Sequence, residues 1–224
     1  MQKWCWVISW VGLSWLTAVT QASECHIFSH SFETAPATIE PCAPTTGTVL
    51  KGPFQAGGEI TLTVLDDSLE PTSEAYTGTI TDSSGQFAVS ADVGTGPIQI
   101  TATGPFFNEF GNGVTSESLT LSAITEARPG EPIHINAFST IETDRLKALV
   151  GEGQSLAQAK SKAIDEIFEQ LFGEASRVTD STRLTWGQPG FDRLLAFSAL
   201  LITDQSDASP TVAETSQLIG LFRQ

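Results

Sequence analysis

The hydrophobic pattern of this chain changes within the stretch EPIHINAFSTIETDRLKALV, residues 131–150. From residue 48 to 124, apolar residues alternate with polar ones in short runs interrupted by Gly, Pro and Asp, which is typical of β-strands and hairpins. From about residue 137 onward they recur every three or four positions, which indicates helices. The sequence therefore predicts an α+β protein with segregated strands and helices, and we expect each part to close its own hydrophobic core.

Residues 47–128 predict an antiparallel β-sandwich, because short strand patterns follow one another with no room for crossover helices. The clearest hairpin turn is Asp82-Ser83-Ser84-Gly85, where glycine can adopt a positive φ. The expected strands cover residues 48–50, 59–65, 78–81, 86–90, 97–103 and 118–124. The expected core consists of Val49, Ile60, Leu62, Val64, Ile80, Phe87, Val89, Ile98, Ile100, Leu119 and Leu121.

The remainder of the chain, residues 138–224, predicts a small α-helical bundle. Its first helix starts with a cap at Ser139 or Thr140, and Glu142 and Asp144 lie in its first turn.

Three further helices follow. Ser155 is a good N-cap for a helix over residues 156–172, and Gly173 is placed to end it. The nearly continuous apolar run 191–203 predicts a central helix, and residues 211–222 predict a shorter amphipathic one.

The first 22 residues predict an export signal. Lys3 precedes an uncharged apolar run, residues 4–19, and small residues lead to a cleavage position after Ala22. That run is shorter than the roughly 20 residues that span a bilayer, although an uncleaved anchor stays an alternative. We expect an exported protein, located in the periplasm, at the cell surface or outside the cell, with residues 23–46 as an arm and linker.

Cys25 and Cys42 are the cysteines that remain after cleavage, and an oxidising compartment favours a disulfide between them. Cys25, His26, His30 and Cys42 could alternatively bind zinc, but their spacing is irregular and exported cysteine pairs are usually bridged. Lipidation of Cys25 is disfavoured because Glu24 precedes it. We expect no metal and no cofactor.

The charge of the chain excludes some partners. The net charge is −15, and removal of the signal, whose one charged residue is Lys3, makes it −16. So negative a surface repels phosphate backbones and anionic headgroups. We expect no nucleic-acid partner and no membrane association after signal cleavage.

The stretches GTVLKGPF (residues 47–54), YTG (76–78) and TDSSGQF (81–87) resemble the carboxypeptidase regulatory-like modules of exported bacterial proteins. The resemblance covers the predicted sandwich and implies a transthyretin-like, or prealbumin-like, fold. Such modules are generally noncatalytic; they space other domains and sometimes bind carbohydrate or protein. The segments GPFFNE (104–109) and NAFS (136–139) are similar to an arrangement in exported bacterial proteins in which the second segment starts a helical half.

The candidate binding surface is an aromatic cluster between glycines: Phe106, Phe107, Asn108, Glu109 and Phe110. On a loop, these residues would offer a hydrophobic patch to a glycan or a protein. The alternative, which we favour for the phenylalanines, is that they fold back and plug one end of the sandwich.

Lys51 raises the question of a covalent crosslink, because related adhesin sandwiches sometimes join a lysine to an asparagine. That chemistry needs a desolvated lysine beside an asparagine and a buried carboxyl that transfers protons. Asn108, Asn112 and Asn136 are available. The Gly-Pro pair after Lys51 instead predicts a turn, where lysine is normally solvated.

Motifs of enzymes are absent from the sequence: it has no Gly-x-Ser-x-Gly, no phosphate-binding loop, no His-Glu-x-x-His and no EF-hand loop. His134 alternates with apolar residues, and we expect it to face solvent. We expect Asp165, Glu166 and Glu169 to form the wet face of a helix.

The sequence thus predicts a noncatalytic binding or structural module of the cell envelope or secretome, of unknown oligomeric state. Two alternatives stay open. One is a small hydrolase with an acidic site between the two halves, which should show converging carboxylates with raised pKa values in a deep pocket. The other is a purely structural spacer.

Overall fold

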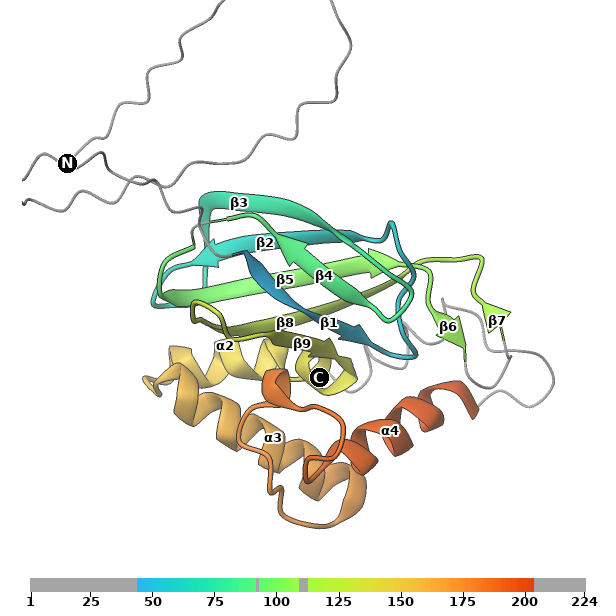
Figure 1. Ribbon diagram of the computed structural model, residues 1–224. Helices are drawn as coiled ribbons and strands as arrows, with labels where there is room; N and C mark the ends of the chain where they lie inside the picture. Colours follow the sequence, from blue (N-terminus) through green and yellow to red (C-terminus); the bar gives the residue numbers. More distant parts are fainter. Residues whose placement is uncertain (1–43, 92, 109–112, 204–224) are drawn as a thin grey trace, which may run out of the picture.

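The computed structural model describes residues 44–91, 93–108 and 113–203, and in them strands precede helices, as predicted (Figure 1). The change of element type falls between residues 136 and 137. The strands are β1 Thr45–Leu50, β2 Glu59–Leu65, β3 Pro71–Ile80, β4 Gln86–Val89, β5 Gly96–Gly104, β6 Phe107–Asn108, β7 Gly113–Val114, β8 Leu119–Ala127 and β9 Ile133–Asn136. The helices are α1 Ala137–Ile141, α2 Thr143–Gly151, α3 Leu156–Phe172, the 3₁₀ helix η1 Ser181–Arg183 and α4 Phe191–Thr203.

Seven of these strands form one sheet in the order β8-β5-β2-β3-β4-β1-β9, and β6 and β7 form a separate small pair. The pairings are antiparallel except that of β9 with β1, which is parallel. The two ends of this order, β8 and β9, contact each other, so the sheet curls almost into a barrel (Figure 1). The mainly antiparallel sheet agrees with the prediction; a two-sheet sandwich is not confirmed.

The alternating pattern behaves as expected in the central strands. In β2, Ile60 and Leu62 are fully buried, whereas Thr61 and Thr63 are partly exposed. Val64 is the one predicted core residue that stays partly exposed, and it still packs against the core. The predicted hairpin also forms: Gly85 has φ +80°, and a Cβ there would lie 2.5 Å from the Val49 carbonyl oxygen. Glycine is therefore required at the point where the β3–β4 turn passes β1.

Helix α3 has the predicted bounds because its end signals are local. Ser155 caps its first turn in a reciprocal capping box with Gln158, and Gly173 ends it in the left-handed conformation.

The first predicted helix is corrected in two ways. It is split into α1 and α2, and its cap is Asn136 instead of Ser139 or Thr140. The Asn136 side chain accepts a bond from the Ser139 backbone amide, while the Ser139 hydroxyl accepts one from the Asn136 amide. Ser139 thus occupies the N3 position of a capping box whose N-cap residue is Asn136.

The expectation of two separate cores is wrong. Helices α2, α3 and α4 lie on one side of the sheet, and α2 packs against β8 (Figure 1). One continuous cluster of buried residues contains Ile60 and Ile100 of the sheet together with Phe138, Phe168 and Phe197 of the helices. The Phe138 ring lies 5.5 Å, centroid to centroid, from each of the other two phenylalanines. Strands and helices therefore share one interior.

Several predictions concern residues outside the described part of the chain: the signal over 1–22, most of the arm, the Cys25–Cys42 disulfide, and the helix over 211–222. None of the helices in the described residues combines the length and the hydrophobicity that a membrane-spanning segment needs.

Candidate functional site

The candidate site lies where the nearly closed sheet has its seam, between β8 and β9. Strand β8 pairs with β5 along one edge, and among residues 44–91, 93–108 and 113–203 its other edge has no ladder partner. Side chains from the helices bind that edge instead. The Ser122 amide donates to Thr140 Oγ1 (3.0 Å), and Ser139 Oγ donates to the Ser122 carbonyl (2.9 Å). Polar side chains therefore close the seam where a strand would otherwise be needed.

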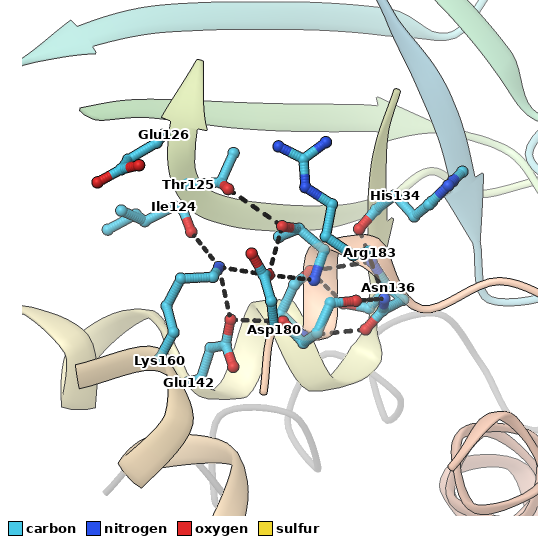
Figure 2. Close-up of polar contacts among 12 residues, drawn as sticks. Ile124, Thr125, Glu126, His134, Asn136, Glu142, Lys160, Asp180 and Arg183 are labelled. Atoms are coloured by element: carbon cyan, nitrogen blue, oxygen red, sulfur yellow. Dashed lines mark hydrogen bonds and ion pairs between the residues drawn. The ribbon is translucent and has the colours of Figure 1, made fainter. Parts of the chain in front are cut away.

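Lys160 is the central group of this seam (Figure 2). It projects from α3, is 4 % exposed, and donates from Nζ to the Ile124 carbonyl of β8 at 2.8 Å. The same Nζ lies 3.0 Å from Asp180 Oδ1 and 3.5 Å from Glu142 Oε1. An ammonium group has three protons to donate, and three oxygen atoms surround this one. The ammonium is thus surrounded by two carboxyl oxygens and one backbone carbonyl oxygen.

Glu142 is the most unusual member of the cluster. It joins α1 to α2 and is fully buried. Its Oε1 accepts a 2.5 Å hydrogen bond from Ser181 Oγ, but its Oε2 has no hydrogen-bond partner in the described part of the chain. Burial raises the pKa of Glu142, and this outweighs the opposing effects of Lys160 and Ser181. Glu142 therefore tends to keep its proton.

Asp180 caps η1 and is the opposite case. Its side chain is 26 % exposed, and it accepts bonds from the Thr182 amide (2.9 Å) and hydroxyl (2.6 Å). Burial would raise the pKa of Asp180, but the Lys160 charge and the Thr182 bonds together lower it. The two carboxyl groups beside Lys160 therefore have pKa values shifted in opposite directions, lowered for Asp180 and raised for Glu142.

The surrounding contacts fix η1 against the sheet. Asn136 Nδ2 donates to the Ser181 carbonyl (2.8 Å), and Thr182 Oγ1 lies 3.1 Å from Thr125 Oγ1 of β8 and can accept a hydrogen bond from it. These bonds hold Asp180 in place because they anchor the two residues that follow it.

His134 is not where the sequence pattern placed it. It lies in strand β9, but it is only 8 % exposed and its Nδ1 lies 2.7 Å from Thr48 Oγ1. Burial, followed by the Arg183 charge, lowers the pKa of His134. The parallel β1–β9 pairing, which covers this position, is a long-range contact that alternation within β9 does not reveal.

Access to the carboxylate cluster is narrow. A depression of about 40 Å³, bordered by Lys160, Asp180, Thr125 and Arg183, reaches it from the surface. Sites for small molecules usually measure about 300–1,000 Å³. The converging carboxylates expected of an acidic hydrolase are thus present between sheet and helices, without a hollow of substrate size at this depression.

The predicted aromatic surface is divided by the structure. Phe106 is 2 % exposed and stacks on Phe54 at 5.9 Å, which agrees with the plug interpretation. Phe107 is partly buried and Asn108 is buried, both in β6. Glu109 and Phe110 lie outside the described residues.

Lys51 is not solvated at a turn, contrary to expectation. It is fully buried, donates from Nζ to the Ser198 carbonyl at 2.9 Å, and lies 5.6 Å from the centre of the Phe106 ring. The chain after Lys51 does turn, but α4 covers the lysine, and a contact so distant in sequence is invisible to local pattern.

The face of α3 that we expected to be exposed to solvent is only partly exposed. Asp165 and Glu169 are exposed, but Glu166 is partly buried and forms a two-point ion pair with Arg145, at 2.7 and 2.9 Å. Its partner comes from α2, which packs beside α3.

A second candidate surface, not identified from sequence, lies at the loops around α4. A groove of about 570 Å³ is bordered by Glu174, Arg177, Asp192 and Arg193, among others. Trp186 is 81 % exposed and packs edge-on against Phe191, which adjoins groove residues in the chain. The sequence contains one indication of this surface, because Trp186 is the single tryptophan outside the predicted export signal.

Sequence reasoning also missed Glu142, Lys160 and Asp180. One signal was present: Lys160 sits between Ala159 and Ala163 on the apolar face of its helix. No group of three or more His, Cys, Asp or Glu residues that could hold a metal occurs in the described residues. Comparisons with known proteins give no relative: no family model, no curated protein and no solved structure matches the chain.

Proposed function

We propose that the protein is an exported, noncatalytic binding module of the bacterial cell envelope or secretome. Its sheet and helices form a rigid scaffold, and the loops around α4 recognise the ligand. The observation that supports this most is the exposed Trp186, whose ring packs against Phe191, the residue between the groove residues Gly190 and Asp192 in the chain. A large aromatic ring left in water next to charged side chains is typical of a recognition surface.

The groove suggests the chemistry of the ligand. Glu174 and Arg193 form a 2.6 Å ion pair along it, and Asp192 and Arg177 add one charge of each sign. A balanced polar lining beside an indole suits a neutral, hydroxyl-rich ligand, which makes a glycan the first choice and a polar protein segment the second. The net charge of −15 disfavours a polyanion.

The family resemblance belongs to this proposal as well. Two of the three stretches that carry it lie side by side, because Gly47 of β1 is paired with Phe87 of β4. We therefore include in the proposal that residues 47–128 form a prealbumin-like module of the carboxypeptidase regulatory type, and the β1–β4 pairing supports it. Export rests on the pattern of residues 1–22.

A glycan array probed with the chain lacking residues 1–22 tests the proposal. A glycan that binds should change the fluorescence of Trp186, the single tryptophan of that chain. Trp186→Ala should weaken binding at least about tenfold, as expected for a central aromatic contact. Leu195→Ala, another exposed apolar residue, is the control and should bind normally. Equal binding by both variants would contradict the role of Trp186, and an array with no binder would contradict the glycan.

The acidic hydrolase remains a second candidate because Glu142 and Asp180 converge on one lysine and the pKa of Glu142 is raised. Glu142→Gln should abolish hydrolysis of any substrate that the protein cleaves. The narrow access to this cluster is the reason why we place this candidate second.

A further inference from the structure

We propose that Lys160 and Asp180 condense into an intramolecular amide bond, with Glu142 as the group that transfers the protons. The crosslink would join α3 to η1 across the seam of the sheet. It differs from the crosslink considered for Lys51, and it does not depend on the binding function.

The reacting groups are already in position. The 3.0 Å contact of Lys160 Nζ with Asp180 Oδ1 places the amine beside the carboxyl group whose carbon it would attack. Both partners are fixed from several sides, Lys160 by the Ile124 carbonyl and Asp180 by Thr182. Groups held in this way react as though at very high concentration.

Besides the amine and the carboxyl group that it attacks, the reaction needs a buried acid that transfers protons, and Glu142 lies beside the amine. Its Oε1 lies 3.5 Å from Lys160 Nζ, and its Oε2 has no partner in the described residues. A buried carboxyl oxygen without a hydrogen bond costs stability and calls for an explanation. Proton transfer to and from the reacting atoms would explain it.

The reaction balances without any other reactant. A proton first moves from the Lys160 ammonium to the Asp180 carboxylate along their hydrogen bond, which leaves a neutral amine and a carboxylic acid. The amine nitrogen then forms a bond to Cγ of Asp180. Glu142 gives its proton to the departing hydroxyl oxygen and receives one from the nitrogen. The C–O bond breaks, one water molecule leaves, and Glu142 is again protonated. The small depression bordered by both residues offers the water a way out.

Lys160 is distinguished from the other cations of the described residues. The remaining ion pairs there use Arg128, Arg145, Arg183 or Arg193, and a guanidinium does not lose its proton to become a nucleophile. Lys51 is a second buried lysine; its Nζ donates to the Ser198 carbonyl of α4 and lies over the Phe106 ring.

The mass of the intact, reduced and denatured protein tests the proposal. It should be lower than the sequence mass, counted from the N-terminus actually present, by one water molecule. Trypsin should then fail to cut after Lys160 and should release residues 148–162 joined to residues 178–183. A mass that matches the sequence would overturn the proposal. So would a linear, dehydrated 178–183 peptide, which indicates a cyclic imide at Asp180, or loss of ammonia at Lys51.

Two variants test the proton transfer. Glu142→Gln keeps the shape of the side chain but cannot exchange the proton, and we expect its full sequence mass together with a native circular dichroism spectrum. Glu166→Gln breaks an ion pair on the surface of α3 and should still lose the water molecule. If the Glu142→Gln protein were still lighter by one water molecule, Glu142 would not be the group that transfers the protons. If the Glu166→Gln protein had its full sequence mass, the failure to form the crosslink would not be specific to the Lys160 cluster.

Discussion

Lys160 stabilises the fold because its ammonium group donates hydrogen bonds to buried and half-buried oxygen atoms. In the protein before the proposed crosslink forms, loss of this ammonium group would remove a hydrogen-bond donor from the Ile124 carbonyl and the ion-pair partner from the Asp180 carboxylate. Replacing Lys160 by Met should therefore lower the free energy of unfolding by about 3–5 kcal/mol, the cost usual for breaking a buried pair. Urea denaturation would measure this. Lys162→Met, an exposed position on the same helix, should change stability by less than about 0.5 kcal/mol. Similar losses in both variants would contradict the role of the cluster.

Glu142 should make stability depend on pH. Because burial raises its pKa above the ordinary 4.5, the folded protein binds more protons than the unfolded chain above that pH. Its contribution is therefore complete below about pH 4.5 and is lost as pH rises through the folded-state pKa. In urea titrations across this range, wild-type stability should fall more steeply with rising pH than that of Glu142→Gln. Parallel curves would show that Glu142 is ionised in the folded protein.

At the scale of elements, two capping boxes offer a matched comparison. Asn136 caps α1 inside the protein and also donates to the Ser181 carbonyl, whereas Ser155 caps α3 at the surface. Ser155→Ala should cost about 1 kcal/mol, as exposed caps do. Asn136→Ala should cost more, about 2–4 kcal/mol, because a buried carbonyl also loses its donor. Equal costs, measured by urea denaturation, would mean that the Asn136 bond to η1 contributes little.

The elements that sequence predicts well are those defined by neighbouring residues. Helix α3 has its cap, its apolar face and its terminal glycine within one stretch, so its bounds could be predicted to the residue. The β9 pairing with β1, the burial of Lys51 under α4 and the meeting of Lys160 with Asp180 join distant segments. No local period carries that information. The candidate site was therefore missed, although a lysine on the apolar face of its helix marked one member.

At the scale of the whole molecule, the shared core explains how a curled sheet can be stable with an open seam. A free strand edge exposes backbone groups and invites association with other chains. Here α1, α3 and η1 bind the free edge of β8, and their apolar faces continue the interior of the sheet. The helices thus complete the sheet, so the two parts should fold together.

Phe138 is the residue at which this cooperativity can be tested. Its ring is fully buried and contacts Phe168 of α3 and Phe197 of α4, while it belongs to the same cluster as the sheet core. Phe138→Ala should cost about 3–5 kcal/mol because of the cavity that it leaves. Since the loss falls on a shared core, hydrogen exchange should become faster by the same factor in peptides from β5 and from α3. Phe107→Ala, in the separate β6–β7 pair and already partly exposed, should leave both protections nearly unchanged. If Phe138→Ala accelerated exchange in α3 alone, the helices would be an independent unit, and the original expectation of two cores would be correct.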